Sequence, residues 1–281
     1  MKAQQECFTC LQNQVMAKGV PLAWYQQRLD LIPKDSKGAS LDLTPPQIAI
    51  DLYAKMACDL GVSDPFAEIK RHSIHKAHQM LEGLEWRDLD LQEALRLSAF
   101  GNVIDYGSAS QFCIHDFDFA QEFKKLDFAC FELEAFITKL QEARIFVMLG
   151  DNAGENLFDE ILLRVLSRDF PQLVLYYFVR GGPIINDITL KDLREYKQCA
   201  GIFEVASVVD SGVRSPGFVY EDASLEARRL FDEADVILSK GMGNFECLNE
   251  RTDKRVMYLL KIKCQVVAHC LNLPLGKMVF R

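Results

Sequence analysis

The residues best suited to carry chemistry stand in an acidic turn directly after a short apolar run. The run Ile145–Leu149 contains no polar residue, and GDNAGE follows it at positions 150–155. Such a run suits a strand buried on both faces, and helical spacing from Leu157 onward puts the turn at the carboxyl end of that strand. Ligands bind at this end in parallel α/β sheets, and Asp151 and Asn152 offer the oxygen atoms that hard divalent cations prefer. Either residue would also serve as a helix cap, so this turn alone does not decide between the two roles.

Polar residues also follow three further apolar runs. The carboxyl ends of parallel strands share one edge of a sheet, so we expect these groups to converge there. Carboxylates crowded into one crevice repel one another unless a cation neutralises them. The set therefore predicts a divalent metal that faces a phosphate, with a lysine as point-charge ligand and glycines that allow close backbone approach. The three sets are Arg180 with Asn186-Asp187, Asp210-Ser211-Gly212, and Lys240-Gly241.

The sequence pattern changes near residue 144. Residues 1–140 consist mostly of amphipathic helical segments, and the Phe-rich segment Asp116–Ala143 predicts one long helix. From Arg144 onward, apolar runs alternate with helical patterns, as in a parallel, doubly wound sheet. We therefore predict an α/β protein with a helical domain at 1–140 and a Rossmann-like domain at 141–281 that carries the metal site. The predicted strands are Ile145–Leu149, Leu173–Val179, Phe203–Val209, Val236–Leu238 and Val256–Ile262.

Composition restricts the classes of partner. The 281 residues carry a net charge of −8, and this acidic balance argues against a nucleic-acid-binding surface. No apolar run is long enough for a membrane span, and the N-terminal stretch does not have the pattern of a signal peptide. We expect a cytoplasmic protein that binds a small phosphate ester and has no nucleic-acid or membrane partner. Nothing in the sequence indicates an oligomeric state.

The nine cysteines are best explained as reduced thiols, because the chain shows no secretion signal. Cys7 and Cys10 lie one helical turn apart and would need two further ligands for a tetrahedral zinc site. His72, His75 and His78 are candidates, but steps of three residues drift around a helix, so a solvated face is the favoured interpretation. A redox pair of the kind found beside a βαβ unit is disfavoured in the helical half, and the role of the two cysteines is left open.

Taken in order, the motifs resemble those of the damage-control phosphatases, a family of metal-dependent phosphatases first catalogued as a domain of unknown function. The resemblance rests on DNAGE at 151–155, NDIT at 186–189 and KGMGNFE at 240–246, with GNVID at 101–105 before the sheet. The CFTC stretch at 7–10 is similar to a pair found in a branch of mostly prokaryotic, stand-alone members. The resemblance extends over nearly the whole chain.

This resemblance implies an α/β/α sandwich with a helical domain, and a phosphatase that acts on sugar phosphates or damaged phosphopantetheine-type compounds. It implies that Asp151, Asn152 and Asp187 hold one divalent metal and that Lys240 contacts the substrate phosphate. An oxygen-rich site of this kind accepts Mg²⁺, Mn²⁺, Co²⁺ or Ni²⁺.

A mechanism follows as a hypothesis. The metal would polarise a phosphoryl oxygen while Lys240 neutralises the developing charge, so Asp151, Asp187 and Lys240 are predicted catalytic residues. Water activated by a nearby carboxylate is the favoured nucleophile, and direct attack by Asp105 or Asp210 is the alternative. For Asn102 and Ser211 a turn or cap role is an equally good interpretation. The predicted substrate-binding residues are Asn102, Asp105, Glu155, Arg180, Ser211, Gly212 and Gly241.

Two other functions fit parts of the sequence. A methyl- or nucleotidyl-transferase on a Rossmann-like sheet requires a glycine-rich first turn and an acidic residue after the second strand, where Arg180 stands instead. The Gly241-Met242-Gly243 turn lacks the third glycine of a dinucleotide site, because Glu246 occupies its position. A non-catalytic metabolite-binding protein would tolerate loss of a metal ligand, yet all three candidate ligands are present.

Overall fold

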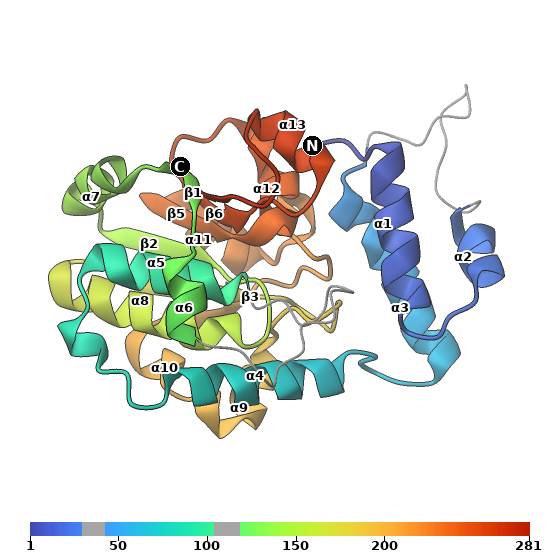
Figure 1. Cartoon of the computed structure of the whole chain (residues 1–281), viewed down its shortest axis with the longest axis horizontal. Coiled ribbons are helices and arrows are strands. Elements are labelled where there is room, and N and C mark those ends of the chain that lie inside the picture. The colour runs from blue at the N-terminus through green and yellow to red at the C-terminus, as the bar shows by residue number, and fades with distance from the viewer. Residues whose placement is uncertain (30–42, 104–118) are drawn as a thin grey trace.

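A seven-stranded sheet organises most of the computed structural model, which describes residues 1–29, 43–103 and 119–281 (Figure 1). The strand order is β1-β7-β6-β5-β2-β3-β4. Strands β2 to β6 run parallel to one another, whereas β7 pairs antiparallel with β6 and parallel with β1. The predicted α/β class with a mainly parallel sheet is therefore confirmed. The strands are β1 (Phe128–Phe131), β2 (Ile145–Leu149), β3 (Val174–Val179), β4 (Ser207–Asp210), β5 (Val236–Lys240), β6 (Val256–Lys261) and β7 (Met278–Phe280).

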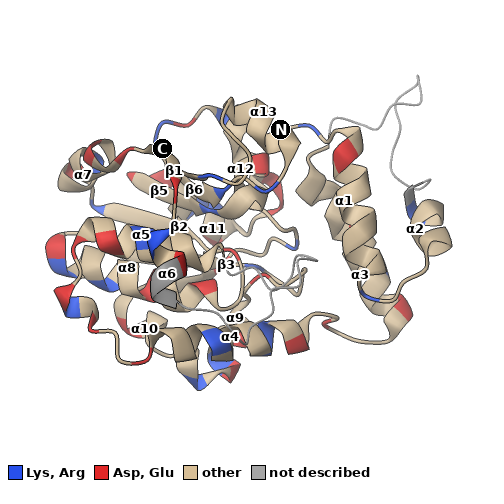
Figure 2. Ribbon diagram, in the orientation of Figure 1, with Lys and Arg blue, Asp and Glu red and all other residues tan. Residues whose placement is uncertain are grey.

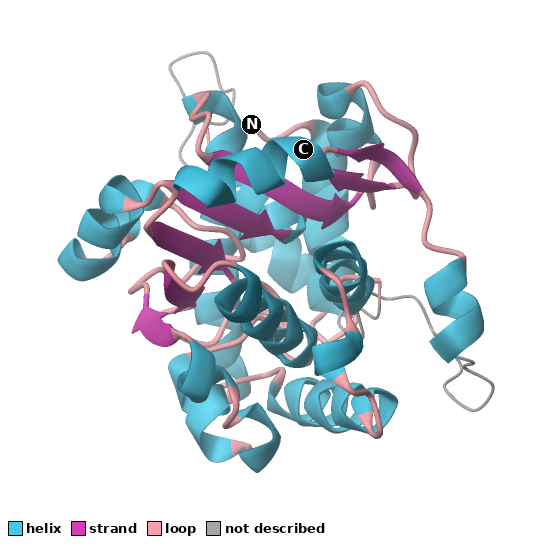
Figure 3. Ribbon diagram, turned by 90° about the vertical axis from the view of Figure 1, so that its left-hand side faces the viewer, coloured by secondary structure: helices cyan, strands magenta, loops and turns pink. Residues whose placement is uncertain are grey.

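Helices cover both faces of this sheet, as Figure 3 shows for the turned view. In the described part of the chain the longer helices are α1 (Gln5–Met16), α2 (Leu22–Leu29), α3 (Pro45–Leu60), α4 (Ala67–Leu81), α5 (Leu91–Gly101), α7 (Leu133–Glu142), α8 (Glu155–Asp169), α11 (Leu225–Glu233) and α12 (Gly241–Leu248). The shorter ones are α6 (Phe119–Lys124), α9 (Leu190–Glu195), α10 (Ile202–Val205) and α13 (Gln265–Leu271).

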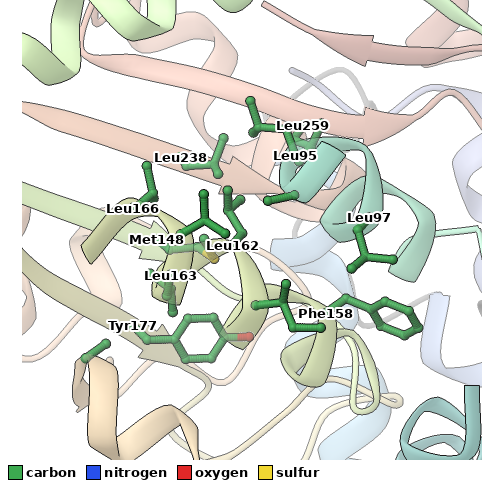
Figure 4. Close-up of a cluster of buried hydrophobic side chains, with 14 of the residues drawn as sticks. Leu95, Leu97, Met148, Phe158, Leu162, Leu163, Leu166, Tyr177, Leu238 and Leu259 are labelled. Carbon is green, nitrogen blue, oxygen red and sulfur yellow. The ribbon is translucent and has the colours of Figure 1, made fainter. Parts of the chain in front are cut away.

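Alternate side chains of the central strand β2 enter two different hydrophobic cores. Phe146 and Met148 pack on the side of α5 and α8, and Val147 and Leu149 pack on the side of α11. Burial on both faces is the reason that the β2 run contains no polar residue. Figure 4 shows the first core, in which Leu162 and its neighbours on α8 meet leucines of α5 and of the sheet.

The hydrophobic cores divide the chain near residue 66, whereas the sequence predicted a boundary near residue 140. Helices α1 to α3 share a small core of their own, which includes Val15, Leu52 and Met56. Helices α4, α5 and α7 instead contribute to the core of the sheet, through residues such as Ile74 and Phe136. Helical periodicity shows that a helix has a buried face but does not show what that face packs against.

Two predicted elements need correction. The segment Asp116–Ala143 is not one long helix, because its described part forms α6, β1 and α7 in succession. Phe128 and Phe131 pack edge-on in β1, and Phe131 also contacts Phe280 of the paired strand β7. These aromatic residues therefore stabilise strand pairing, and do not form the buried face of a helix. The predicted strand Phe203–Val209 is split between α10 and β4.

Charged residues are interspersed over the outer helices. In the ribbon of Figure 2, acidic and basic residues are spread over the helices, α8 among them. Within the described ranges, no helix is both long and apolar enough to cross a membrane.

Candidate metal centre

The turn after β2 lies directly against the segment that follows β3. The backbone N–H of Ala153 donates to the carbonyl of Asn186 at 2.8 Å, and that of Ile188 donates to the carbonyl of Asp151 at 2.9 Å. These bonds flank an isolated antiparallel bridge between Asn152 and Asp187. Asp151 and Asn152 are thus brought next to Asp187, which follows Asn152 by 35 positions, and all three predicted metal ligands lie at the carboxyl edge of the sheet.

Arg180, the residue after β3, is a buried guanidinium that holds two of these ligands. Its Nε donates to Asp187 Oδ2 at 2.6 Å, and one terminal nitrogen lies 3.5 Å from Asp151 Oδ1. The remaining donors bond to Asn244 Oδ1 at 3.0 Å and to the carbonyl of Pro216 at 3.0 Å. Arg180 was predicted to bind substrate, but its contacts here orient and neutralise the carboxylates.

The carboxylates of Glu155 and Asp151 hold the amide of Asn152, and Asn102 bonds to the same two carboxylates. Asn152 Nδ2 donates to Glu155 Oε1 at 2.7 Å and to Asp151 Oδ2 at 3.1 Å. Asn102 Nδ2 donates to the same two carboxylates at 2.9 and 3.2 Å, and its Oδ1 accepts from the backbone N–H of Lys261 at 3.1 Å. Asn152 Nδ2 therefore faces these carboxylate oxygens, which leaves Oδ1 as the atom that Asn152 can offer to a cation.

The buried carboxylates of this centre hold protons more tightly than usual. Burial raises the pKa of Asp151 well above its ordinary value, and the charges of Asp187 and Glu155 raise it further. Burial raises the pKa of Asp187 to about 7, although Arg180 opposes that shift. Burial also raises the pKa of Glu155. A cation among these groups would replace the protons and remove the mutual repulsion.

The donor set fits a divalent metal. Asp187 Oδ1 is a buried carboxylate oxygen with no hydrogen-bond partner, although Oδ2 of the same group is bonded to Arg180. A buried charged oxygen left unsatisfied is costly, and a cation held together with Asp151 and Asn152 would satisfy it. The described residues contain no cluster of three His, Cys, Asp or Glu side chains arranged to bind a metal, and the candidate set instead combines two carboxylates with an amide oxygen.

A cavity of about 640 Å³ adjoins this centre, and both Asp151 and Asn152 line it. Residues of α1 and α3 also line it, as does the segment that follows β6. Lys261 and Lys263 add two positive charges, and the charge of Lys263 lowers the pKa of Asp151. Neither lysine was among the predicted site residues. Lys261 stands at the end of the predicted strand Val256–Ile262 and Lys263 directly follows it, so the rule that selected Arg180 could also have selected them.

Lys240 is buried beneath the centre and does not line the cavity. Its Nζ forms an ion pair with Asp159, lies 3.4 Å from Glu155 Oε2, and donates to the carbonyl of Ser98 at 3.1 Å. Burial alone would lower the pKa of this ammonium, but Asp159 and Glu155 raise it. These contacts indicate that Lys240 anchors Glu155, in contrast to the contact with substrate phosphate implied by the sequence.

The turn after β4 stands apart from the centre. Asp210 is exposed, and its carboxylate accepts from the backbone N–H of Gly212 at 2.9 Å. Ser211 is buried, and its hydroxyl accepts from the N–H of Val213 at 3.3 Å. None of these residues lines the cavity, so the structure does not bring this predicted set to the site. Asp105 lies outside the described residues.

A family profile described as the damage-control phosphatase ARMT1-like domain matches residues 3–279. The chain belongs to the damage-control phosphatase family. It is 31% identical to a damage-control phosphatase of Pyrococcus horikoshii over 99% of this chain and 97% of that protein. A damage-control phosphatase of Archaeoglobus fulgidus is 33% identical over 83% of this chain and 80% of its own length. The crystal structure of a DUF89 family protein from P. horikoshii has a TM-score of 0.82 to this fold at 29% identity, covering 100% of this chain and 98% of that one.

Membership of the damage-control phosphatase family confirms the resemblance seen in the motifs. The match covers the α1–α3 unit as well as the sheet, so both walls of the cavity belong to the family domain.

Substitution of Gly241 by alanine should disrupt the centre. The glycine has a φ of +75°, and an added Cβ would lie 1.8 Å from Asp151 Oδ2. We expect Gly241→Ala to weaken metal binding, measured by calorimetry, because the carboxylate must move. Gly83→Ala is the matched control, since Gly83 has a φ of +80° but nothing within 4 Å of the added Cβ. Equal metal affinity in the two variants would mean that Asp151 is not a ligand.

Replacement of Lys240 by methionine separates the anchoring role from a phosphate-binding role. Asp159 and Glu155 would be left buried without their cation, so the free energy of unfolding should fall by about 3–5 kcal/mol. Urea denaturation of the metal-free protein measures this change, with the exposed Lys191→Met as control. An unchanged unfolding free energy together with weaker phosphate binding would instead support the role implied by the sequence.

Proposed function

We propose that this protein is a divalent-metal-dependent phosphatase that hydrolyses a small phosphorylated metabolite. The observation that carries the proposal is the buried, unpartnered Asp187 Oδ1 beside Asp151 and Asn152, two residues that line a cavity together with Lys261 and Lys263. Ligands for a cation and positive charges for an anion thus meet in one place. The names of the Pyrococcus and Archaeoglobus relatives support phosphatase chemistry on damaged metabolites.

Asp151, Asn152 and Asp187 would hold the metal, with Mg²⁺, Mn²⁺, Co²⁺ and Ni²⁺ as candidates. When bound, it supplies Lewis-acid polarisation of the phosphoryl group. Arg180 orients both carboxylates and favours their ionised forms, through its bond to Asp187 and its approach to Asp151. Such preorganisation means that little rearrangement is needed when charge develops on the substrate.

Lys261 and Lys263 are the cavity lysines proposed to attract the phosphate dianion. They line the same cavity as Asp151, and the positive charge of Lys263 acts to lower the pKa of both Asp151 and Glu155. Lysine binds phosphate as a point charge, which suits a group whose negative charge is spread over several oxygens.

Water is the proposed nucleophile. Direct attack by Asp210 lacks support, because that carboxylate is exposed, bonded to the N–H of Gly212 and outside the cavity.

The cavity volume of about 640 Å³ lies within the usual range for small-molecule sites. Sugar phosphates are therefore a suitable first panel of substrates.

Asp187→Asn should remove metal-dependent phosphate release while keeping the shape of the site. We expect a loss of more than about 100-fold, since even the outer partners of metal ligands typically contribute about 10- to 100-fold. The assay uses metal-stripped protein, adds back each of the four metals, and measures phosphate released from p-nitrophenyl phosphate and sugar phosphates. Asp210→Asn is the control and should retain activity; full activity in Asp187→Asn would contradict the ligand set.

Lys263→Met should reduce kcat/KM by about 10- to 100-fold, the range expected for one charge-assisted contact of about 1.5–3 kcal/mol. Metal affinity should not fall, because the variant removes a positive charge from beside Asp151. The exposed Lys191→Met serves as the control for loss of a charge. Unchanged kinetics in Lys263→Met would show that this lysine does not meet the phosphate.

A further inference from the structure

Three thiols line the same cavity as Asp151 and Asn152. Cys7 and Cys10 lie on α1, and Cys264 lies at the N-cap of α13, so the thiols reach the cavity from different parts of the chain. The proposed phosphatase chemistry uses none of them. The described residues contain no arrangement of three such side chains suited to a metal, so the zinc site considered from the sequence gains no support.

The geometry of α1 suits a bond between Cys7 and Cys10. A step of three residues along a helix separates two Cα atoms by about 5 Å, which lies inside the range of about 4.4–6.8 Å found for disulfides. Both cysteines are free thiols in this structure. Cys264 is near enough for its charge to raise the pKa of both thiols, but a bond to it would join α1 to the segment after β6, whereas a bond between Cys7 and Cys10 stays within one helix.

The two thiols differ in access. Cys10 is exposed and Cys7 is buried, although both contribute to the cavity wall. Burial raises the pKa of both thiols, and the carboxylate of Glu246 raises it further. The pair is therefore held as thiols at neutral pH and is oxidised only slowly, with the exposed Cys10 as the first point of attack.

We propose that Cys7 and Cys10 form a reversible thiol–disulfide modification site in the cavity wall, oxidised by small disulfides such as glutathione disulfide. The Cys10 thiolate attacks one sulfur of the small disulfide, forming a mixed disulfide and releasing one thiol. The Cys7 thiolate then attacks the Cys10 sulfur and releases the second thiol. Two protein thiols become one disulfide, one small disulfide becomes two thiols, and the two protons end on those thiols.

Oxidation would reshape the α1 side of the cavity. The sulfur of Cys7 accepts from the N–H of Gln4 at 3.4 Å, and that of Cys10 accepts from Gln14 Nε2 at 3.5 Å. Gln14 in turn accepts from the hydroxyl of Tyr53 on α3. Drawing the two sulfurs to bonding distance disturbs these contacts, none of which involves Asp151, Asn152 or Asp187, so the change should affect substrate binding more than the chemical step.

Disulfide formation is tested on the full-length protein by incubation with excess glutathione disulfide, blocking of free thiols and peptide mapping by mass spectrometry. The peptide with Cys7 and Cys10 should be two hydrogens lighter and unblocked, and dithiothreitol should reverse this. Cys10→Ser should abolish the bond, while Cys264→Ser and Cys58→Ser should retain it. A persistent mixed disulfide at Cys10, a link to Cys264, or protection of all three thiols by added zinc would overturn the proposal.

The effect on catalysis rests on the proposed function and is measured separately. The oxidised protein should show a raised KM for p-nitrophenyl phosphate with kcat little changed, and Cys10→Ser should be insensitive to glutathione disulfide. An unchanged KM in fully oxidised protein would refute the effect on the cavity. Absence of any phosphatase activity would refute the proposed function, while the peptide map would still decide whether the disulfide forms.

Discussion

The buried guanidinium of Arg180 is the interaction on which the rest of the site depends. It binds Asp187 and Asn244 and reaches Asp151, and thereby joins the ends of β2, β3 and β5. Removing several carboxylates from water is costly unless opposite charges accompany them. The buried group comprises the carboxylates of Asp151, Glu155, Asp159 and Asp187 with the cations of Arg180 and Lys240. The carboxylates exceed the cations by two charges, which is the charge of one divalent metal.

A second buried network ties this charge balance to the hydrophobic core. Asp159 of α8 accepts from Ser98 of α5 at 2.6 Å and from the hydroxyl of Tyr177 of β3 at 3.1 Å, and it also pairs with Lys240. In Figure 4 the Tyr177 ring lies among the apolar side chains, and its hydroxyl points toward the helices. The packing of α5 and α8 on the sheet therefore sets the position of Lys240, and through Glu155 that of Asn152.

Local sequence identified the polar ends of the strands but could not give their order across the sheet. The residues after β2 and β5 are neighbours, so Gly241 lies against Asp151, whereas β4 is the edge strand and its Asp210 faces outward. Strand order arises from long-range packing, which no local pattern contains. Local sequence also does not show to which face of the sheet a side chain at the end of a strand points. Lys240 is the last residue of β5, and its side chain points to the α5–α8 face instead of the cavity. The proposed metal ligands rest on a motif resemblance, which added information that the spacing lacked, and they stay a prediction.

The small helical unit affects the metal centre without supplying any of its proposed ligands. Ile184, which precedes the Asn186-Asp187 segment, is buried in the core of α1 to α3, and its carbonyl accepts from the N–H of Asp187 at 3.1 Å. The next residue, Ile185, has a φ of +35°, a strained value for a β-branched residue that the surrounding packing must maintain. Packing of the helical unit thus holds one end of the loop that presents Asp187, while Arg180 holds the carboxylate itself. The core of α1 to α3 and the guanidinium of Arg180 thus fix Asp187 from two sides, one through its backbone and the other through its carboxylate.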